Sequence, residues 1–176
     1  MACDFFKEEA GRINAVLTFK RSELLYEVKN CSFIEGTVME TQSEHNRHTV
    51  QDVGEEGNVD RITRMLDLAV AKCKEMMYPF TKTQVEELAA FDNKLREREV
   101  YGIVLSLPGG FSRTSLAYLE KLIHEFVVDR AMSEWMKLTN PSKVRLWEER
   151  QERSEVEIKA ALMSRRTHLR RKQSPF

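Results

Sequence analysis

The sequence predicts a mainly α protein: a helical bundle with a C-terminal αα-hairpin, a small two-stranded β element and an extended basic C-terminal arm. Three observations predict this class. Apolar residues recur at helical spacing over most of the chain, only two short segments alternate apolar with polar residues, and the C-terminus is rich in cations. With 176 residues, 41% of them hydrophobic and 32% charged, the chain has the size and composition of one globular domain. We place this domain at 1–164 and the arm at 165–176.

The N-terminal third contains one predicted strand and one predicted helix. Residues 15–20 are β-prone and roughly alternating, which predicts a strand. Apolar residues then recur at helical spacing and predict a helix over about 22–40, although Asn30 and Gly36 leave two short strands as the alternative. The polar segment 41–57 ends in Gly-Glu-Glu-Gly and is expected to be a surface loop.

The middle of the chain predicts a second helix and a second strand. Asn58 is expected to cap a strongly periodic helix that Pro79 ends. Residues 83–98 are charged and predict a short or loosely held helix. The alternation in residues 100–107 predicts a strand, which a Pro-Gly-Gly turn ends. Paired with residues 15–20, it forms a two-stranded ribbon that needs cover from helices or from a neighbouring subunit.

The last third predicts the αα-hairpin. Apolar residues recur at helical spacing over about 114–138 and again over about 141–164. Between these two helices, Asn140 is expected to cap the second one, with Pro141 in its first turn. The short connection makes the two helices antiparallel neighbours.

The charge of the chain is balanced overall but unevenly distributed. Lys and Arg number 28, as do Asp and Glu, so no global field directs the chain to nucleic acid or to a membrane. Five of the cations lie in the arm, which has no acid, so the rest carries a net charge of −5. Residues 35–60 hold seven acids and one arginine. No apolar run approaches the roughly 18 residues of a membrane span, and the acidic N-terminus argues against a signal peptide.

No set of residues predicts catalysis or a metal site. His45 and His48, with Asp52 nearby, form half of a conceivable zinc site, but such a site needs three or four ligands, so we favour a solvated loop. The turn at 107–112 lacks the Gly-Lys-Ser/Thr ending of a phosphate loop. Cys73 lies on an apolar helix stripe and is expected to be buried and inert. Three cysteines cannot all pair within one chain, which favours a reducing compartment. We therefore expect no enzymatic activity and no cofactor.

The basic arm is the most distinctive feature of the sequence. One interpretation is a frayed, solvated terminus. A second is an element that binds nucleic acid by neutralising phosphates, which makes a small nucleic-acid-binding protein the alternative function. A third is a peg that docks into an acidic groove of a partner protein, with Phe176 as an apolar anchor. The arm and the acidic segment 35–60 are also complementary between copies arranged head to tail.

The order of elements resembles a known family. A helix from Val59 to Phe80, a strand, a long helix over 119–135 and a last helix that continues into an Arg-rich arm are similar to the small head–tail connector (adaptor, or neck) proteins of tailed bacteriophages. Three stretches look most like versions from phages of gut Bacteroides-type bacteria: Gly57-Asn58-Val59-Asp60-Arg61, Leu122-Ile123-His124-Glu125-Phe126 and Arg170-Arg171-Lys172-Gln173-Ser174-Pro175-Phe176. The likeness covers about residues 58–176 and lies in pattern and arrangement; it does not account for residues 1–57.

The resemblance implies a structural virion protein. It implies a dodecameric homo-oligomeric ring in the neck of the virion, assembled in the host cytoplasm, that docks on the portal and contacts downstream tail or neck proteins. DNA passes through its lumen without sequence recognition, and no membrane, metal or cofactor is involved. The portal-facing residues are expected to be Arg165, Arg166, Arg170, Arg171, Lys172 and Phe176. The subunit-interface residues are expected to be Val16, Phe19, Glu55, Glu56, Tyr101 and Ile103.

Overall fold

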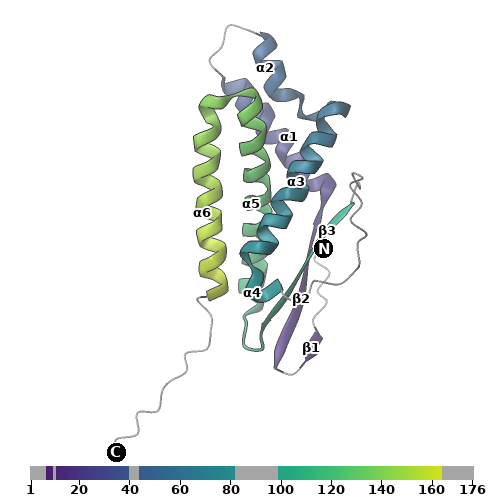
Figure 1. Cartoon of the computed structure of the whole chain (residues 1–176), viewed down its shortest axis with the longest axis vertical. Helices are drawn as coiled ribbons and strands as arrows, with labels where there is room; N and C mark the ends of the chain where they lie inside the picture. Colours follow the sequence, from purple (N-terminus) through teal and green to yellow (C-terminus); the bar gives the residue numbers. More distant parts are fainter. Residues whose placement is uncertain (1–6, 10, 40–43, 82–98, 164–176) are drawn as a thin grey trace, which may run out of the picture.

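The structure, a computed structural model, describes residues 7–9, 11–39, 44–81 and 99–163. Helices run side by side along its long axis, and a small sheet lies along one side of them (Figure 1). The elements in chain order are β1 Lys7–Glu9, β2 Arg12–Lys20, α1 Arg21–Val38, α2 Glu44–Gln51, η1 Asp52–Gly54, α3 Glu56–Met76, α4 Tyr78–Thr81, β3 Val100–Pro108, α5 Arg113–Thr139, η3 Pro141–Lys143 and α6 Val144–Met163. The predicted mainly α class with a small β element is confirmed.

The sheet is antiparallel with the strand order β1-β2-β3. The strands predicted at 15–20 and 100–107 are present and pair with each other, with Ala15 opposite Leu105. Both strands are longer than predicted, and β1 adds a third strand that the sequence analysis did not foresee. Gly11 forms the turn between β1 and β2 with a φ of 75°, a left-handed conformation that favours glycine.

One face of the sheet belongs to the core. Its alternate side chains are buried, as the period of a strand requires: Ala15, Leu17 and Phe19 on β2, and Tyr101, Ile103, Leu105 and Leu107 on β3. These side chains are continuous with the buried stripes of α1, α3 and α5 in one apolar core. Cover by helices therefore stabilises a ribbon that would be marginal alone.

The helix α5 is the centre of the bundle, because α6, α3 and α1 all pack on it. It forms the predicted αα-hairpin with α6, and the connection begins at Pro141. The helix α6 starts at Val144, slightly later than predicted, because a 3₁₀ turn precedes it. The side chain of Asn140 stabilises this turn by accepting a hydrogen bond from the hydroxyl of Ser142 at 2.6 Å.

The prediction of a surface loop over 41–57 is wrong for the residues of this segment that the structure describes, because residues 44–54 are helical. Most side chains of α2 are exposed, so this segment lacks the apolar periodicity of a core helix. Val50 and Val53 are its buried side chains. The Trp135 indole Nε1 donates a hydrogen bond to the carbonyl oxygen of Val50 at 2.9 Å, which ties the segment to α5.

One prediction about α3 also needs correction. The helix begins at Glu56 rather than at a cap formed by Asn58. The side-chain amide of Asn58 instead donates a hydrogen bond to the carbonyl oxygen of Asp52 at 2.7 Å and connects α3 to η1. The predicted end of this helix near Pro79 is confirmed, because α3 ends at Met76 and Pro79 lies in the separate short helix α4.

The helix α1 is continuous, which confirms the helix predicted over 22–40 and makes the alternative of two short strands wrong. The helix predicted over 83–98 and the arm at 165–176 lie outside the described residues.

Candidate interaction surfaces

The outer side of α1 carries large apolar side chains that are exposed, among polar and charged ones. The inner side of the helix buries Leu24 and Val28 in the core, as an amphipathic helix should. Four large apolar side chains are nevertheless more than half exposed: Tyr26 (69%), Phe33 (58%), Ile34 (54%) and Val38 (65%). Large exposed apolar patches mark interaction sites. We call these four residues the α1 outer face.

A cavity of about 370 Å³ lies beside the N-terminal end of this face, between β2, α1 and α5. Its walls are formed by Thr18 and Phe19 from β2, Glu23 and Glu27 from α1, and Glu120, Lys121, His124 and Glu125 from α5. Four carboxylates and one ammonium give the cavity an excess of negative charge, and carboxylates accept charge-assisted hydrogen bonds from cations. The arrangement is suited to receive a cationic group.

His124 forms the inner wall of this cavity. Its Nε2 atom lies 3.0 Å from Oε2 of Glu27, but the two atoms are out of line for a hydrogen bond. Its ring lies 6.3 Å from the ring of Phe19, at 49° to it. The imidazole of His124, which remains partly exposed, thus provides a flat surface beside the carboxylates on which a guanidinium can stack.

A second polar cluster, which the sequence analysis missed, joins α5 to α6. Asp129 is only 4% exposed, and one of its oxygens lies 3.3 Å from Nε of Arg150. Burial raises the pKa of Asp129 to about 6, against the opposing effects of Arg150 and of a hydrogen bond from Ser154. The guanidinium of Arg150 also lies over the ring of Trp147. Asp129 interrupts an otherwise apolar helix stripe, which is the signal that could have revealed it.

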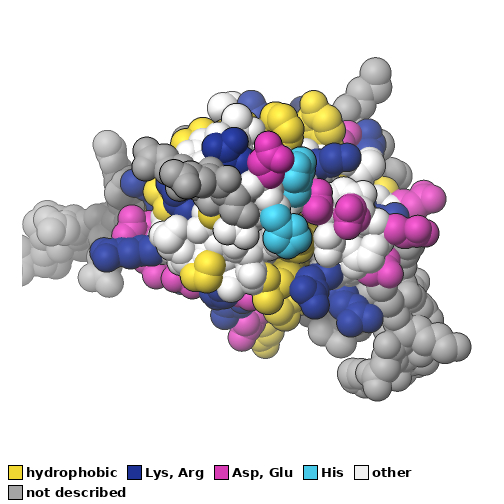
Figure 2. All heavy atoms as spheres, turned by 90° about the horizontal axis from the view of Figure 1, so that it is seen from above, with side chains coloured by type: hydrophobic (Ala, Val, Ile, Leu, Met, Phe, Trp, Pro, Cys, Tyr) yellow, Lys and Arg dark blue, Asp and Glu magenta, His cyan; other side chains and the backbone are white. Residues whose placement is uncertain are grey.

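The imidazoles of His45 and His48 lie on the exposed helix α2 and not in a loop. Figure 2 views the molecule from the end at which α2 lies and shows acidic and basic side chains intermixed there with histidine. Among residues 7–9, 11–39, 44–81 and 99–163, no three His, Cys, Asp or Glu side chains are grouped so that they could hold a metal ion.

The predicted burial of Cys73 is confirmed, and burial raises the pKa of its thiol to about 12. Burial also raises the pKa of Cys31, which is half-buried on α1. The turn predicted over 107–112 connects β3 to α5, and the Phe111 amide donates a hydrogen bond to the carbonyl oxygen of Pro108 at 2.9 Å. It is a strand-to-helix turn in the structure, as expected.

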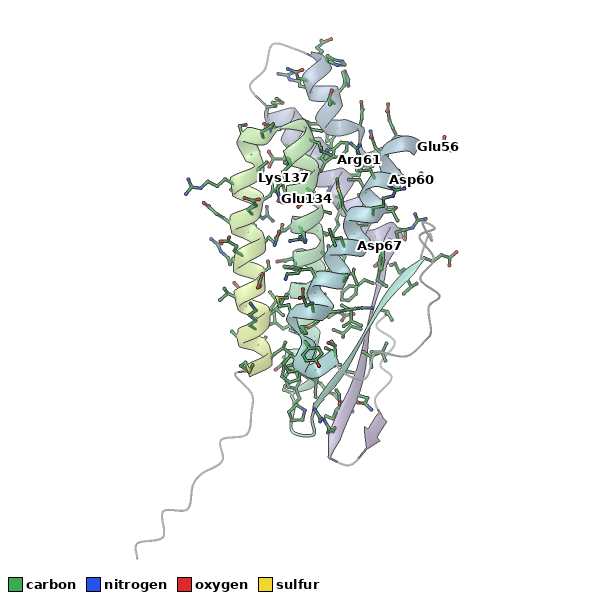
Figure 3. The ribbon with its side chains drawn as sticks, viewed as in Figure 1. Glu56, Asp60, Arg61, Asp67, Glu134 and Lys137 are labelled. Carbon is green, nitrogen blue, oxygen red and sulfur yellow. The ribbon has the colours of Figure 1, made fainter. Side chains whose placement is uncertain are left out.

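The residues predicted for a subunit interface separate into two groups. Phe19, Tyr101 and Ile103 point to the helices and are buried in the chain's own core, so they are corrected from interface to core residues. Val16 lies on the opposite face of the sheet and is partly exposed. Glu55 and Glu56 are exposed at the start of α3, and Figure 3 shows Glu56 at the end of an acidic row that continues with Asp60 and Asp67.

The portal-facing residues predicted on the arm lie outside the described residues. They are Arg165, Arg166, Arg170, Arg171, Lys172 and Phe176.

None of the described helices is long and apolar enough to cross a membrane. Comparisons with models of protein families, with curated proteins and with solved structures found no match to this chain.

Proposed function

We propose that this chain is a structural assembly protein without enzymatic activity, a head–tail connector (adaptor) subunit of a tailed bacteriophage. It forms a ring in the neck of the virion, docks on the portal, contacts downstream tail or neck proteins and extends the DNA channel. The observation that carries the proposal is the set of exposed large apolar side chains on the α1 outer face, beside the glutamate-lined cavity. Such a face on a small helical body is a surface for another protein.

The αα-hairpin supports the role of the arm. The packing of α5 on α6 is the most extensive helix–helix contact among the described elements. Near the end of α6 the hydroxyl of Tyr118 donates a hydrogen bond to Glu157 at 2.8 Å. The last described residue, Met163, therefore stands on a firmly held helix. In the sequence, the arm with its five cations follows this helix after Ser164.

The mechanism is mechanical. In a ring, each arm makes one modest contact with the portal, and the symmetry of the ring multiplies these contacts into a strong attachment. The net charge of −5 on the body is suited to a DNA channel, because walls of the same sign as DNA let it slide without binding.

Removal of the arm tests the proposal. We expect a chain that ends at Ser164 to give the circular dichroism spectrum and thermal midpoint of the full chain but to bind portal-bearing heads at least tenfold more weakly. Pull-down of the heads with a titrated amount of chain measures this change. A matched control replaces Arg145 and Arg153, exposed cations of α6, with glutamine, and we expect it to bind normally. Normal binding of the heads by the shortened chain would show that the arm does not dock on the portal.

The nucleic-acid-binding alternative makes a different prediction for the same arm. Five cations on duplex DNA give a slope of about −4.5 in a plot of log affinity against log salt concentration. The proposal expects no such binding near physiological salt. If the full chain binds duplex DNA tightly with that slope, and loses this binding when the arm is removed, the nucleic-acid-binding function is supported and the connector role is contradicted.

A further inference from the structure

We infer that the α1 outer face receives the outer face of α3 from a second copy of this chain. The inference rests on the proposed function, because a closed ring requires each subunit to present two different and mutually complementary faces. The inference identifies these two faces, which the proposal of a ring does not specify.

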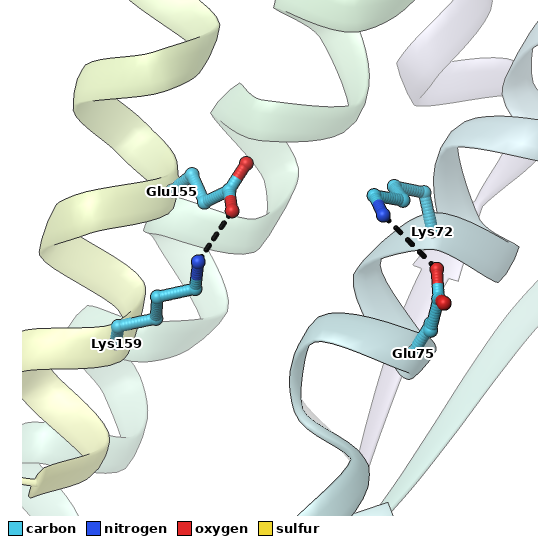
Figure 4. Close-up of polar contacts among 4 residues, drawn as sticks. All are labelled: Lys72, Glu75, Glu155 and Lys159. Carbon is cyan, nitrogen blue, oxygen red and sulfur yellow. Dashed lines mark hydrogen bonds and ion pairs between the residues drawn. The ribbon is translucent and has the colours of Figure 1, made fainter.

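One stripe on the exposed side of α3 is cationic, beside the acidic row of Glu56, Asp60 and Asp67. Arg61, Arg64, Leu68 and Lys72 follow one another at spacings of three and four residues and are all exposed, with Leu68 57% exposed. Within the described part of the chain, neither Arg61 nor Arg64 has an ion pair or a hydrogen bond. Lys72 is engaged by Glu75 of its own helix at 3.0 Å, as Figure 4 shows. Two unpaired guanidinium groups thus lie on the N-terminal side of an exposed leucine in this stripe.

The two faces point in opposite directions. On their inner sides α1 and α3 approach each other, where Arg21 donates a hydrogen bond to the hydroxyl of Thr63 at 3.4 Å. The α1 outer face and the row from Arg61 to Lys72 lie on the far sides of the two helices. In Figure 1 α3 lies in front of α5, and α1 lies behind it. This placement is that of a heterologous contact, which repeats from copy to copy, rather than of a twofold contact.

The chemistry of the two faces is complementary. The carboxylates of Glu23 and Glu27 are about half exposed, although Lys20 and His124 lie beside them, so both remain accessible to a further cation. The cavity beside them is large enough for a guanidinium, a group that also stacks on rings such as those of Tyr26 and Phe33. The aliphatic stems of arginine cover apolar surface, and Leu68 adds to it. Tyrosine and arginine are the residue types that dominate the energy of protein interfaces.

Charge reversal on each face tests the inference. One variant carries Glu23→Arg and Glu27→Arg, and a second carries Arg61→Glu and Arg64→Glu. A control carries Glu149→Arg and Glu152→Arg, two exposed glutamates on α6. Sedimentation velocity of the full chain, in low salt and at up to about 1 mM protein, measures self-association in the range of weak interfaces. Circular dichroism and thermal melting verify that each variant is folded.

We expect the wild type and the control to associate, and each interface variant alone to associate at least tenfold more weakly. The decisive sample is an equimolar mixture of the two interface variants. In a heterologous contact, the unchanged α1 of one variant pairs with the unchanged α3 of the other, as in the wild type. The reversed α1 pairs with the reversed α3, where the charges are again opposite. Both contacts are therefore attractive, and the mixture regains association. A chain that carries all four reversals is expected to associate by itself for the same reason.

Three outcomes would overturn the inference: a wild type that stays monomeric throughout, interface variants that associate like the control, or a mixture that regains nothing. Loss of association in the α1 variant alone would indicate a twofold contact between two α1 faces instead. The proposed function is tested separately, by binding of portal-bearing heads. A chain that binds the heads but fails the mixing experiment keeps the proposed function and loses this interface.

Discussion

The indole Nε1 of Trp135 donates a hydrogen bond to the backbone carbonyl oxygen of Val50, although the two residues are 85 positions apart. The bond is buried and joins the end of α2 to the central helix. It satisfies a donor and an acceptor that would each cost free energy if they were buried alone. The first prediction follows from this contact.

Replacement of Trp135 by phenylalanine is expected to lower the free energy of unfolding. It removes part of a buried ring and leaves the Val50 carbonyl without its partner, at a cost of about 1–3 kcal/mol for the unsatisfied group alone. Urea unfolding followed by circular dichroism measures the change. Trp147→Phe is the matched control, because the Trp147 Nε1 is buried without a hydrogen-bond partner among the described residues. Equal losses in the two variants would contradict a stabilising role for the bond.

Asp129 is expected to make stability depend on pH. Its pKa is raised to about 6 in the folded chain from 3.8, so between these values the folded state holds more protons than the unfolded state. Stability contributed by this group therefore falls as pH rises from about 4 to about 6, by up to about 3 kcal/mol in total. Asp129→Asn is expected to lack this contribution.

Urea unfolding of both chains at several pH values between 4 and 7.5 measures the effect. The quantity to follow is the difference in unfolding free energy between wild type and variant, because other carboxylates titrate in both chains. A difference that stays constant with pH would show that Asp129 titrates normally. Glu125 and Arg150 face this carboxyl, and both are present in the two chains.

The thiol of Cys73 is expected to resist alkylation while the chain is folded. Its pKa of about 12 leaves almost no thiolate at pH 8, and its side chain is fully buried. Iodoacetamide labelling followed by mass spectrometry of the peptides measures this, with labelling in urea as the positive control. Labelling of Cys73 in the folded chain at the rate of a free thiol would contradict the packing of α3.

Two glycines are expected to respond to alanine in opposite ways. A Cβ at Gly109 would lie 2.9 Å from the carbonyl oxygen of Gly11, a backbone atom that cannot move away easily, so Gly109→Ala should cost about 1–3 kcal/mol. A Cβ at Gly57 meets nothing within 4 Å at the start of α3, so Gly57→Ala should stabilise the chain by up to about 1 kcal/mol. Thermal unfolding measures both variants, and a shared sign would contradict this account.

The elements with strong local periodicity were predictable. The strand alternation at 15–20 and 100–107, and the stripes of α1, α3, α5 and α6, identified these elements because their apolar residues repeat with the period of the structure they form. The segment at 44–54 was not predictable in this way. It contributes little more than Val50 and Val53 to the core, and it is held by its packing on α1 and by the bond from Trp135.

The predicted subunit-interface residues on the sheet also show what local periodicity cannot predict. Val16 and Phe19 have opposite parity on β2, so they cannot share a face. Alternation alone separates the two faces but does not say which one the helices cover. The cavity also escaped prediction, because its glutamates come from α1 and α5, nearly a hundred residues apart.

The sequence by itself determined the helices with a clear stripe, the two principal strands, the αα-hairpin and the uneven charge, since each depends on neighbours within a few turns of the chain. The tertiary structure alone decided that α2 is a helix packed on α1 and bonded to a distant indole, that Asp129 is buried, and that four large apolar side chains of α1 are more than half exposed. Those features depend on which surfaces meet, and contacts between remote segments leave little trace in local periodicity.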